Sequence, residues 1–63
     1  MFIIERCDWI PGIAHYWTGN SWSDDIHQAI RFFTRSAAGR YGLDDLPEFN
    51  WIVSEIQTNL DRI

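Results

Sequence analysis

The side chains of this sequence best suited to covalent chemistry are one thiol, Cys7, and one imidazole, His15. An imidazole beside a thiol can take its proton and leave a nucleophilic thiolate. Such a site also needs a third group that orients the imidazole and donors for an oxyanion, and neither occurs at a recognisable spacing. We therefore expect Cys7 to be a small apolar residue at a strand end, and the chain not to be an enzyme.

Asp24, Asp25 and His27 are the second candidate group, this time for a metal ion. On a helix, Asp24 and His27 would share one face because they are three residues apart. Zinc sites in small domains take four nitrogen or sulfur ligands, whereas the chain has one cysteine and two histidines. The sequence thus predicts no metal and no cofactor, and the two aspartates suit the positive end of a helix dipole.

Size and composition are those of one small globular domain, residues 1–63. Hydrophobic residues make up 46% of the chain and charged residues 22%, which is too apolar for a disordered segment. No apolar run reaches the roughly 18 residues that cross a bilayer, and the N-terminal residues do not resemble a signal sequence, so we expect a cytoplasmic protein. The net charge of -4 disfavours direct binding of nucleic acid, which requires a basic surface.

Two short segments rich in β-branched and aromatic residues predict an N-terminal β-hairpin. They are Phe2–Cys7 and Ile13–Thr18. Pro11 and Gly12 lie between them, and a proline followed by a glycine suits a tight turn.

The register of this hairpin has two possible solutions. A tight turn places Cys7 near Tyr16, whereas a five-residue loop over residues 8–12 places Glu5 opposite His15. The choice matters because a change of register re-pairs every residue across the hairpin.

The next segment has the pattern of an amphipathic helix that begins at Ser23 or Asp24 and ends at Ala38. Serine or aspartate offers a side-chain oxygen to the free amides of a helix start, and Gly39 suits the C-terminal stop. Apolar residues then recur at the spacing of one helical face. They are Ile26, Ala29, Ile30, Phe33 and Ala37.

The C-terminal third fits two structures. Apolar residues repeat at helical spacing from Phe49 to Ile63, and Pro47 suits a first helical turn, which favours a helix over Leu46–Asp61. Residues 49–56 are also rich in β-forming residues and suit a third strand antiparallel to the hairpin. We expect an α+β fold, a β-hairpin followed by two helices on one of its faces. The alternative is a ββαβ chain with a three-stranded antiparallel sheet.

Aromatic side chains are too many for so small an interior. Four of them are tryptophans, and a two-layer domain of 63 residues cannot bury them all. Exposed tryptophan near arginine and carboxylate is typical of protein-binding hot spots. We predict that Trp17 and Trp51 point away from the core and bind a protein. The acids predicted to meet a basic partner surface are Asp24, Asp25, Asp44, Asp45 and Glu48.

Residues 16–33, YWTGNSWSDDIHQAIRFF, resemble the hairpin-to-helix portion of short phage and prophage proteins. The shared features are an aromatic strand, a glycine turn, a tryptophan and an acidic helix start, and they transfer no catalytic residue. The resemblance implies a viral accessory protein of the anti-CRISPR kind, which would bind a host protein or protein-RNA complex in the bacterial cytoplasm and inhibit nucleic-acid-handling defence. A structural or regulatory homodimer with an aromatic interface is the alternative.

Overall fold

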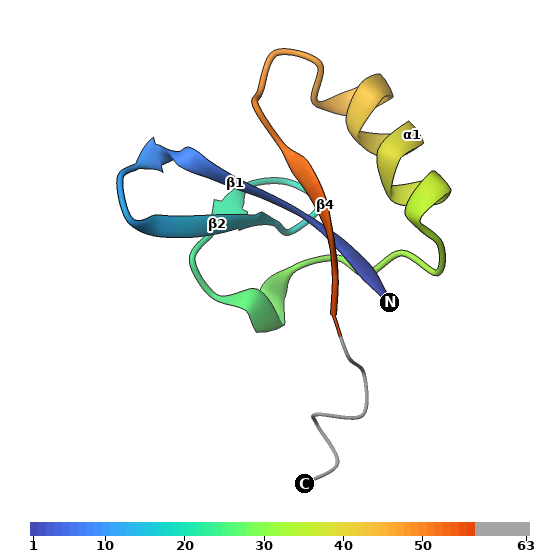
Figure 1. Cartoon of the computed structure of the whole chain (residues 1–63), viewed down its shortest axis with the longest axis horizontal. Helices are drawn as coiled ribbons and strands as arrows, with labels where there is room; N and C mark the ends of the chain where they lie inside the picture. The colour runs from blue at the N-terminus through green and yellow to red at the C-terminus, as the bar shows by residue number, and fades with distance from the viewer. Residues whose placement is uncertain (57–63) are drawn as a thin grey trace, which may run out of the picture.

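The computed structural model describes residues 1–56, which form a four-stranded antiparallel sheet, an α-helix and a short 3-10 helix. In chain order the elements are β1 (Phe2–Ile10), β2 (Ile13–Trp17), β3 (Trp22–Ser23), η1 (Ile26–Gln28), α1 (Arg35–Asp45) and β4 (Ile52–Glu55). The strand order is β3-β2-β1-β4, so β1 lies inside the sheet, between the hairpin partner and the last strand (Figure 1). The α+β class is confirmed, and the arrangement is closer to the ββαβ alternative than to a hairpin with two helices.

The N-terminal hairpin and its turn are confirmed. Gly12 has a φ of 83°, a conformation that glycine adopts without strain after Pro11. Ile10 pairs with Ile13 across the turn, so β1 continues to the turn itself, beyond its predicted end.

A β-bulge then shifts the register along the rest of the hairpin. Between the Ile10-Ile13 pair and the next pair, β1 has three residues but β2 has only one. Beyond this irregularity Arg6 pairs with His15, and Glu5 pairs with Tyr16. The two expected pairings, Cys7 with Tyr16 and Glu5 with His15, are therefore both wrong. The tight turn was predicted correctly, but the extra residues of β1 displace the pairs that follow it.

The helix predicted from residue 23 or 24 to residue 38 is wrong over most of its length. The chain forms β3 and η1 there, and then Phe32 and Phe2 exchange backbone hydrogen bonds of 2.8 and 2.9 Å. Two members of the apolar stripe are exposed, Ile26 by 39% and Phe33 by 86%. Backbone pairing with β1 thus overrides the local helical period, because it satisfies main-chain groups at the edge of the sheet.

α1 begins later than predicted because Thr34 is its N-cap. The Thr34 hydroxyl accepts a hydrogen bond of 3.1 Å from the Ala37 amide. Gly39, the predicted stop, lies within the helix. The helix ends at Leu46, whose amide donates to the Gly42 carbonyl at 2.9 Å.

The predicted helix over Leu46–Asp61 is also wrong as far as the structure describes it. β4 occupies that segment and pairs antiparallel with β1, with Val53 opposite Ile4. The alternative reading, a strand antiparallel to the hairpin, is confirmed. A strand is favoured here because it satisfies the second edge of β1, which a helix would leave open. Residues 57–61 of the predicted helix lie outside the described residues.

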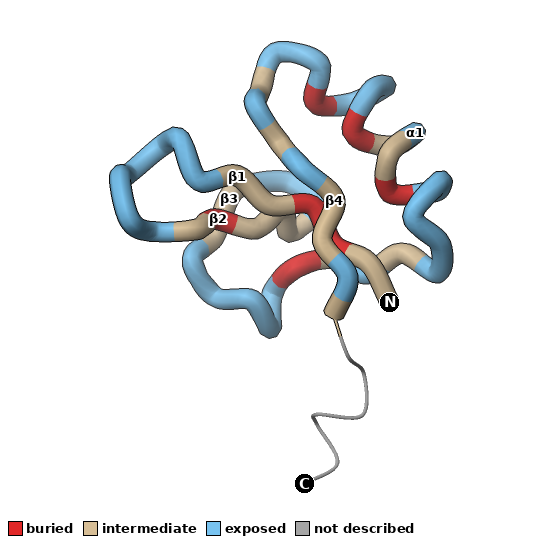
Figure 2. Tube along the Cα trace, viewed as in Figure 1, coloured by how far each residue is buried: buried red, intermediate tan, exposed pale blue. Residues whose placement is uncertain are grey.

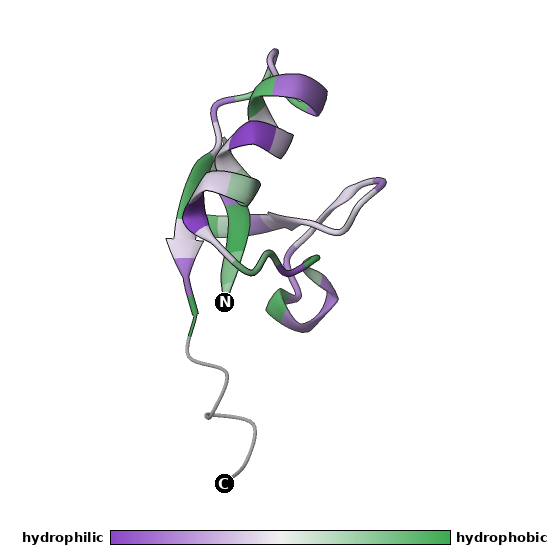
Figure 3. Ribbon diagram, turned by 90° about the vertical axis from the view of Figure 1, so that its right-hand side faces the viewer, coloured by the Kyte–Doolittle hydropathy of each residue, from purple (hydrophilic) through white to green (hydrophobic). Residues whose placement is uncertain are grey.

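The core lies between α1 and one face of the sheet. Its fully buried members are Ile4, Ala38 and Leu46, and the partly buried residues packed against them are Phe2, Trp17, Trp22, Phe32, Tyr41, Phe49, Trp51 and Val53. Figure 2 shows buried positions in β1 and α1, while the end of the hairpin is exposed. The hydropathy colours of Figure 3 show the same division, with hydrophobic residues in β1 and hydrophilic ones on much of α1.

Gly42 and Gly39 of α1 offer a matched pair of alanine substitutions. A Cβ at Gly42 would come within 3.0 Å of the Trp51 indole, whereas a Cβ at Gly39 meets nothing within 4 Å. The indole is held in place, since its Nε1 donates to the Leu46 carbonyl at 2.9 Å. We expect Gly42→Ala to lower the free energy of unfolding by about 1–3 kcal/mol. Gly39→Ala should raise it by up to about 1 kcal/mol, as measured by urea denaturation. Equal effects of the two would contradict the packing of Trp51 on α1.

Candidate functional site

The end of the β1-β2 hairpin exposes three large apolar side chains close together. Trp9 is 53% exposed, and Ile10 and Ile13, on the two sides of the turn, are each 44% exposed. We call residues 9–13 the hairpin tip; Figure 1 shows it extending away from α1. Large apolar side chains displayed together on a short, conformationally restricted turn are typical of a protein-binding surface.

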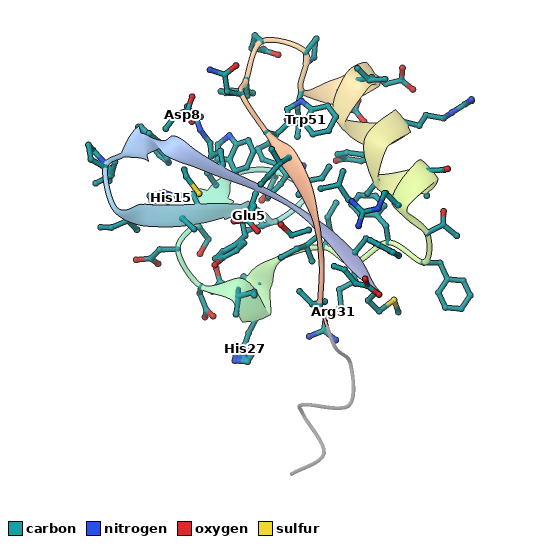
Figure 4. All side chains as sticks on the ribbon, viewed as in Figure 1. Glu5, Asp8, His15, His27, Arg31 and Trp51 are labelled. Carbon is teal, nitrogen blue, oxygen red and sulfur yellow. The ribbon has the colours of Figure 1, made fainter. Side chains whose placement is uncertain are left out.

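An acidic loop lies where α1 leads into its connection to β4. We use this name for Asp44, Asp45 and Glu48, which are all exposed at the end of α1 and the start of its connection to β4. The same connection is tied to β1, because Asn50 Nδ2 donates to Asp8 Oδ2 at 3.1 Å. In Figure 4, Asp8 lies on the side of β1 that faces this connection. The residue before the hairpin tip is therefore bonded to the segment that follows the acidic loop.

Arg6 lies between these two features. Its guanidinium carbon is 5.5 Å from the ring centroid of Trp9, 5.2 Å from that of Trp22 and 5.0 Å from that of Phe49. Its Nε donates to Asp8 Oδ1 at 2.8 Å, and only 13% of the Arg6 side chain is exposed. The hydrogen bond from Arg6, with a weaker one from Asn50, lowers the pKa of the Asp8 carboxyl. A nearly buried cation is thus surrounded by aromatic rings and neutralised by one carboxylate.

The structure does not join Cys7 and His15 into a nucleophilic pair. The Cys7 thiol donates to Glu5 Oε2 at 3.8 Å, and Cys7 is exposed within β1 rather than at a strand end. His15 is 7% exposed and lies against Trp9, with ring centroids 4.8 Å apart. Within residues 1–56 its Nδ1 has no hydrogen-bond partner. The thiol is thus directed at a carboxylate and not at the His15 imidazole.

Asp24 and Asp25 are exposed between β3 and η1. Asp25 Oδ1 accepts from the His27 amide at 3.0 Å, which makes it the N-cap of η1. Among the described residues, no three histidine, cysteine or acidic side chains are placed to hold a metal ion. Figures 1 and 3 show η1 and the end of α1 at opposite ends of the molecule. The predicted binding acids therefore form two separate groups.

Trp17 and Trp51 do not point away from the core, so that expectation is wrong. Both pack partly buried against the core cluster. Trp17 Nε1 donates to the Tyr41 hydroxyl at 3.0 Å, and Trp51 packs on Gly42. For Trp51 the error follows from the wrong element, because a helix was expected over Leu46–Asp61, whereas residue 51 precedes β4 and packs on α1. The predicted part of both tryptophans in protein binding stays a prediction.

Sequence analysis missed the hairpin tip and Arg6. A usable signal was present, because Trp9, Ile10 and Ile13 directly flank Pro11-Gly12 in a turn, where polar residues are usual. Nothing in the sequence indicated the bulge, which brings Arg6 and Trp9 together.

Comparisons with known proteins add no assignment. No protein-family model matches the chain, and no curated protein or solved structure is significantly similar to it. Over residues 1–56, none of the helices has the length and apolar character that a membrane crossing requires. A functional proposal therefore depends on the surface itself.

Two tryptophan substitutions distinguish the core from the surface. Trp17→Ala removes a ring from the core cluster together with its hydrogen bond to Tyr41, so the free energy of unfolding should fall by about 3 kcal/mol. Trp9→Ala removes a half-exposed ring, and we expect a loss of about 1 kcal/mol. Thermal unfolding followed by circular dichroism measures both. The opposite order would show that Trp9, not Trp17, belongs to the core.

The titration of Asp8 tests the Arg6 contact. Because the pKa is lowered from its ordinary value of 3.8, the ion pair stabilises the fold above that pH, and the stabilisation is lost as the pH falls through the folded-state pKa. Carboxyl-carbon NMR should show Asp8 titrating below the ordinary value in the wild type and nearer to it in Arg6→Met. An unchanged titration in Arg6→Met would contradict the contact.

Proposed function

We propose that the chain is a non-enzymatic protein-binding module that inhibits a nucleic-acid-handling defence complex of a bacterial host, in the manner of anti-CRISPR proteins. One observation carries the proposal: the chain exposes both an apolar hairpin tip and an acidic loop, and the hydrogen bond from Asn50 to Asp8 joins the residues that adjoin them. The resemblance of residues 16–33 to short phage proteins supports the same class.

The chemistry of this surface defines the kind of partner. The hairpin tip fits an apolar pocket, and the carboxylates of the acidic loop fit arginine and lysine side chains. Surfaces that hold nucleic acid are basic, so a ligand with this charge competes with phosphate for the same cations. The net charge of -4 also favours approach to such a surface.

The position of Asp44 and Asp45 is better explained by binding than by folding. Both lie in the last turn of α1, which contains no basic residue. The helix dipole favours cations at this end, so these carboxylates lower the stability of the helix. A local arrangement that weakens the fold is expected at functional positions, where a cation of the partner would compensate it.

A homodimer is the second candidate, and the exposed hairpin tip also suits it. A two-fold contact through the tip would bring together two chains that each have a net charge of -4. Like charges at such a contact oppose association. The charge of the chain therefore favours a basic partner over a second copy of the chain.

Photo-crosslinking in bacterial cells tests the proposal. A photoreactive amino acid replaces Ile10 in the hairpin tip, and the control places it at Phe33, which is 86% exposed and follows the residue paired with the opposite end of β1. We expect Ile10, but not Phe33, to crosslink to a nucleic-acid-binding protein. The purified chain should then block nucleic-acid binding by that protein. A crosslink only to a second copy, or none from position 10, would overturn the proposal.

Charge reversal identifies which acids take part. Asp44→Lys with Asp45→Lys should weaken the crosslink from position 10 by about tenfold or more, because cations would then face the basic partner. The fold should survive, since lysine is favoured at the end of a helix. The matched control is Asp24→Lys with Asp25→Lys, at the other end of the molecule. An unaffected crosslink in the first variant would exclude the acidic loop, and loss only in the second would assign binding to the other acids.

A further inference from the structure

We infer that Arg6 is the positioning residue that joins the hairpin tip and the acidic loop into one preformed binding surface. The inference rests on the proposed function, because it explains how the two parts of that surface keep a fixed relation. It is carried by the contacts of Arg6 and by the bulge of β1.

The three rings around Arg6 come from three separate segments. Trp9 belongs to the hairpin tip, Trp22 to β3 and Phe49 to the connection between α1 and β4, and all three ring centroids lie within 5.5 Å of the guanidinium carbon. Trp22 and Phe49 also pack edge to face, with centroids 5.6 Å apart. A guanidinium group is planar and attracts the faces of aromatic rings, so one side chain can hold several segments together.

The bulge places Trp9 in this group. In a regular strand alternate side chains point to opposite faces, so residue 9 would lie on the opposite face from residue 6. The ring of Trp9 lies instead over Arg6 and 4.8 Å from His15, the cross-strand partner of Arg6. Bulges commonly change the direction of one side chain in this way. The extra residues of β1 therefore bring the tip side chain into contact with the cation.

A second connection runs through Asp8. Arg6 Nε donates to Asp8 Oδ1 at 2.8 Å, and Asn50 Nδ2 donates to Asp8 Oδ2 at 3.1 Å. The same carboxylate thus bonds to the cation and to the segment that follows the acidic loop. Arg6 contacts Phe49 in that segment as well, so two neighbouring residues of the connection depend on it.

A surface held in this way before binding loses less conformational freedom when a partner arrives. The hairpin tip and the acidic loop should also move together, because a displacement of Arg6 releases both. This coupling is a property of the free chain and can be measured without a partner.

Hydrogen exchange of the isolated chain tests the coupling. Arg6→Met keeps an apolar stem against the rings but removes the charge and the bond to Asp8. We expect amide exchange in residues 8–10 and in residues 48–50 to become about tenfold faster together, while α1 changes little. Arg6→Lys, which keeps the charge, should restore slow exchange in part. Faster exchange in only one of the two segments, or in neither, would overturn the inference.

Arg35→Met is the matched control. The Arg35 guanidinium carbon lies 5.1 Å from the Phe2 ring centroid, a similar contact at the other end of β1. This variant should leave exchange in both segments unchanged, and an equal acceleration would show that any loss of such a contact loosens the whole domain. If Arg6→Met itself unfolds, Asp8→Ala decides the question, because it removes only the half-exposed partner. Both segments must then exchange faster together, and acceleration of one alone would again refute the coupling.

A crosslinking experiment in the same variant separates this inference from the proposed function. Photoreactive residues at positions 10 and 48 should both lose their crosslinks to the partner in Arg6→Met. If coupled exchange is observed but no partner is ever crosslinked, the proposed function fails and the positioning role of Arg6 stands. If the crosslinks form but exchange is uncoupled, the positioning role fails and the binding surface stands.

Discussion

β1 is hydrogen-bonded along both of its edges, and the rest of the fold follows from that constraint. One edge is paired with β4 over Phe2–Glu5, and the other is paired with β2 and then, at the N-terminal end, with Phe32. Main-chain groups inside a sheet must be satisfied, so the chain returns to β1 twice after the hairpin. These returns fix where the single α-helix of residues 1–56 can lie: it fills the connection between Phe32 and β4 and covers the face that carries Ile4.

Local features of the sequence predicted local structure well. Pro11-Gly12 predicted the turn because both residues restrict the backbone by themselves. The same reasoning failed for Ile26 and Phe33, whose spacing suits a helix but whose segment is used to pair with β1. The spacing of apolar residues contains no information about a backbone partner thirty residues away in the chain. Here the hydrogen bonds to that partner stabilise the segment more than its intrinsic helix preference does. The C-terminal strand was recognisable as an alternative because its residues favour β-structure even in isolation.

The excess of aromatic side chains was a sound observation, but the sequence could not say which rings are exposed. Trp17 and Trp51 are in the core because their neighbours in space are Tyr41 and Gly42 of α1, in a helix that the sequence placed elsewhere. Trp9 lies near the end of the hairpin, where it is half-exposed and a bulge places it next to Arg6, and the sequence contains no marker for that bulge. The candidate site therefore depends on tertiary geometry more strongly than the supporting hairpin does, and for this reason the hairpin was easier to predict.

The acids near the hairpin differ from those of the acidic loop in whether their charges are used within the fold. Glu5 and Asp8 accept hydrogen bonds from Ser54 and Arg6, so their charges are used within the sheet and the hairpin. The acids of the acidic loop are exposed, and two of them lie where the dipole of α1 opposes a negative charge. The Asp8 carboxylate holds Arg6 at the base of the hairpin tip, whereas Asp44 and Asp45 weaken the helix that presents them. The described chain thus combines an exposed apolar turn, fixed at its base by the Asp8 carboxylate, with exposed carboxylates that have no basic residue to compensate them in the last turn of α1.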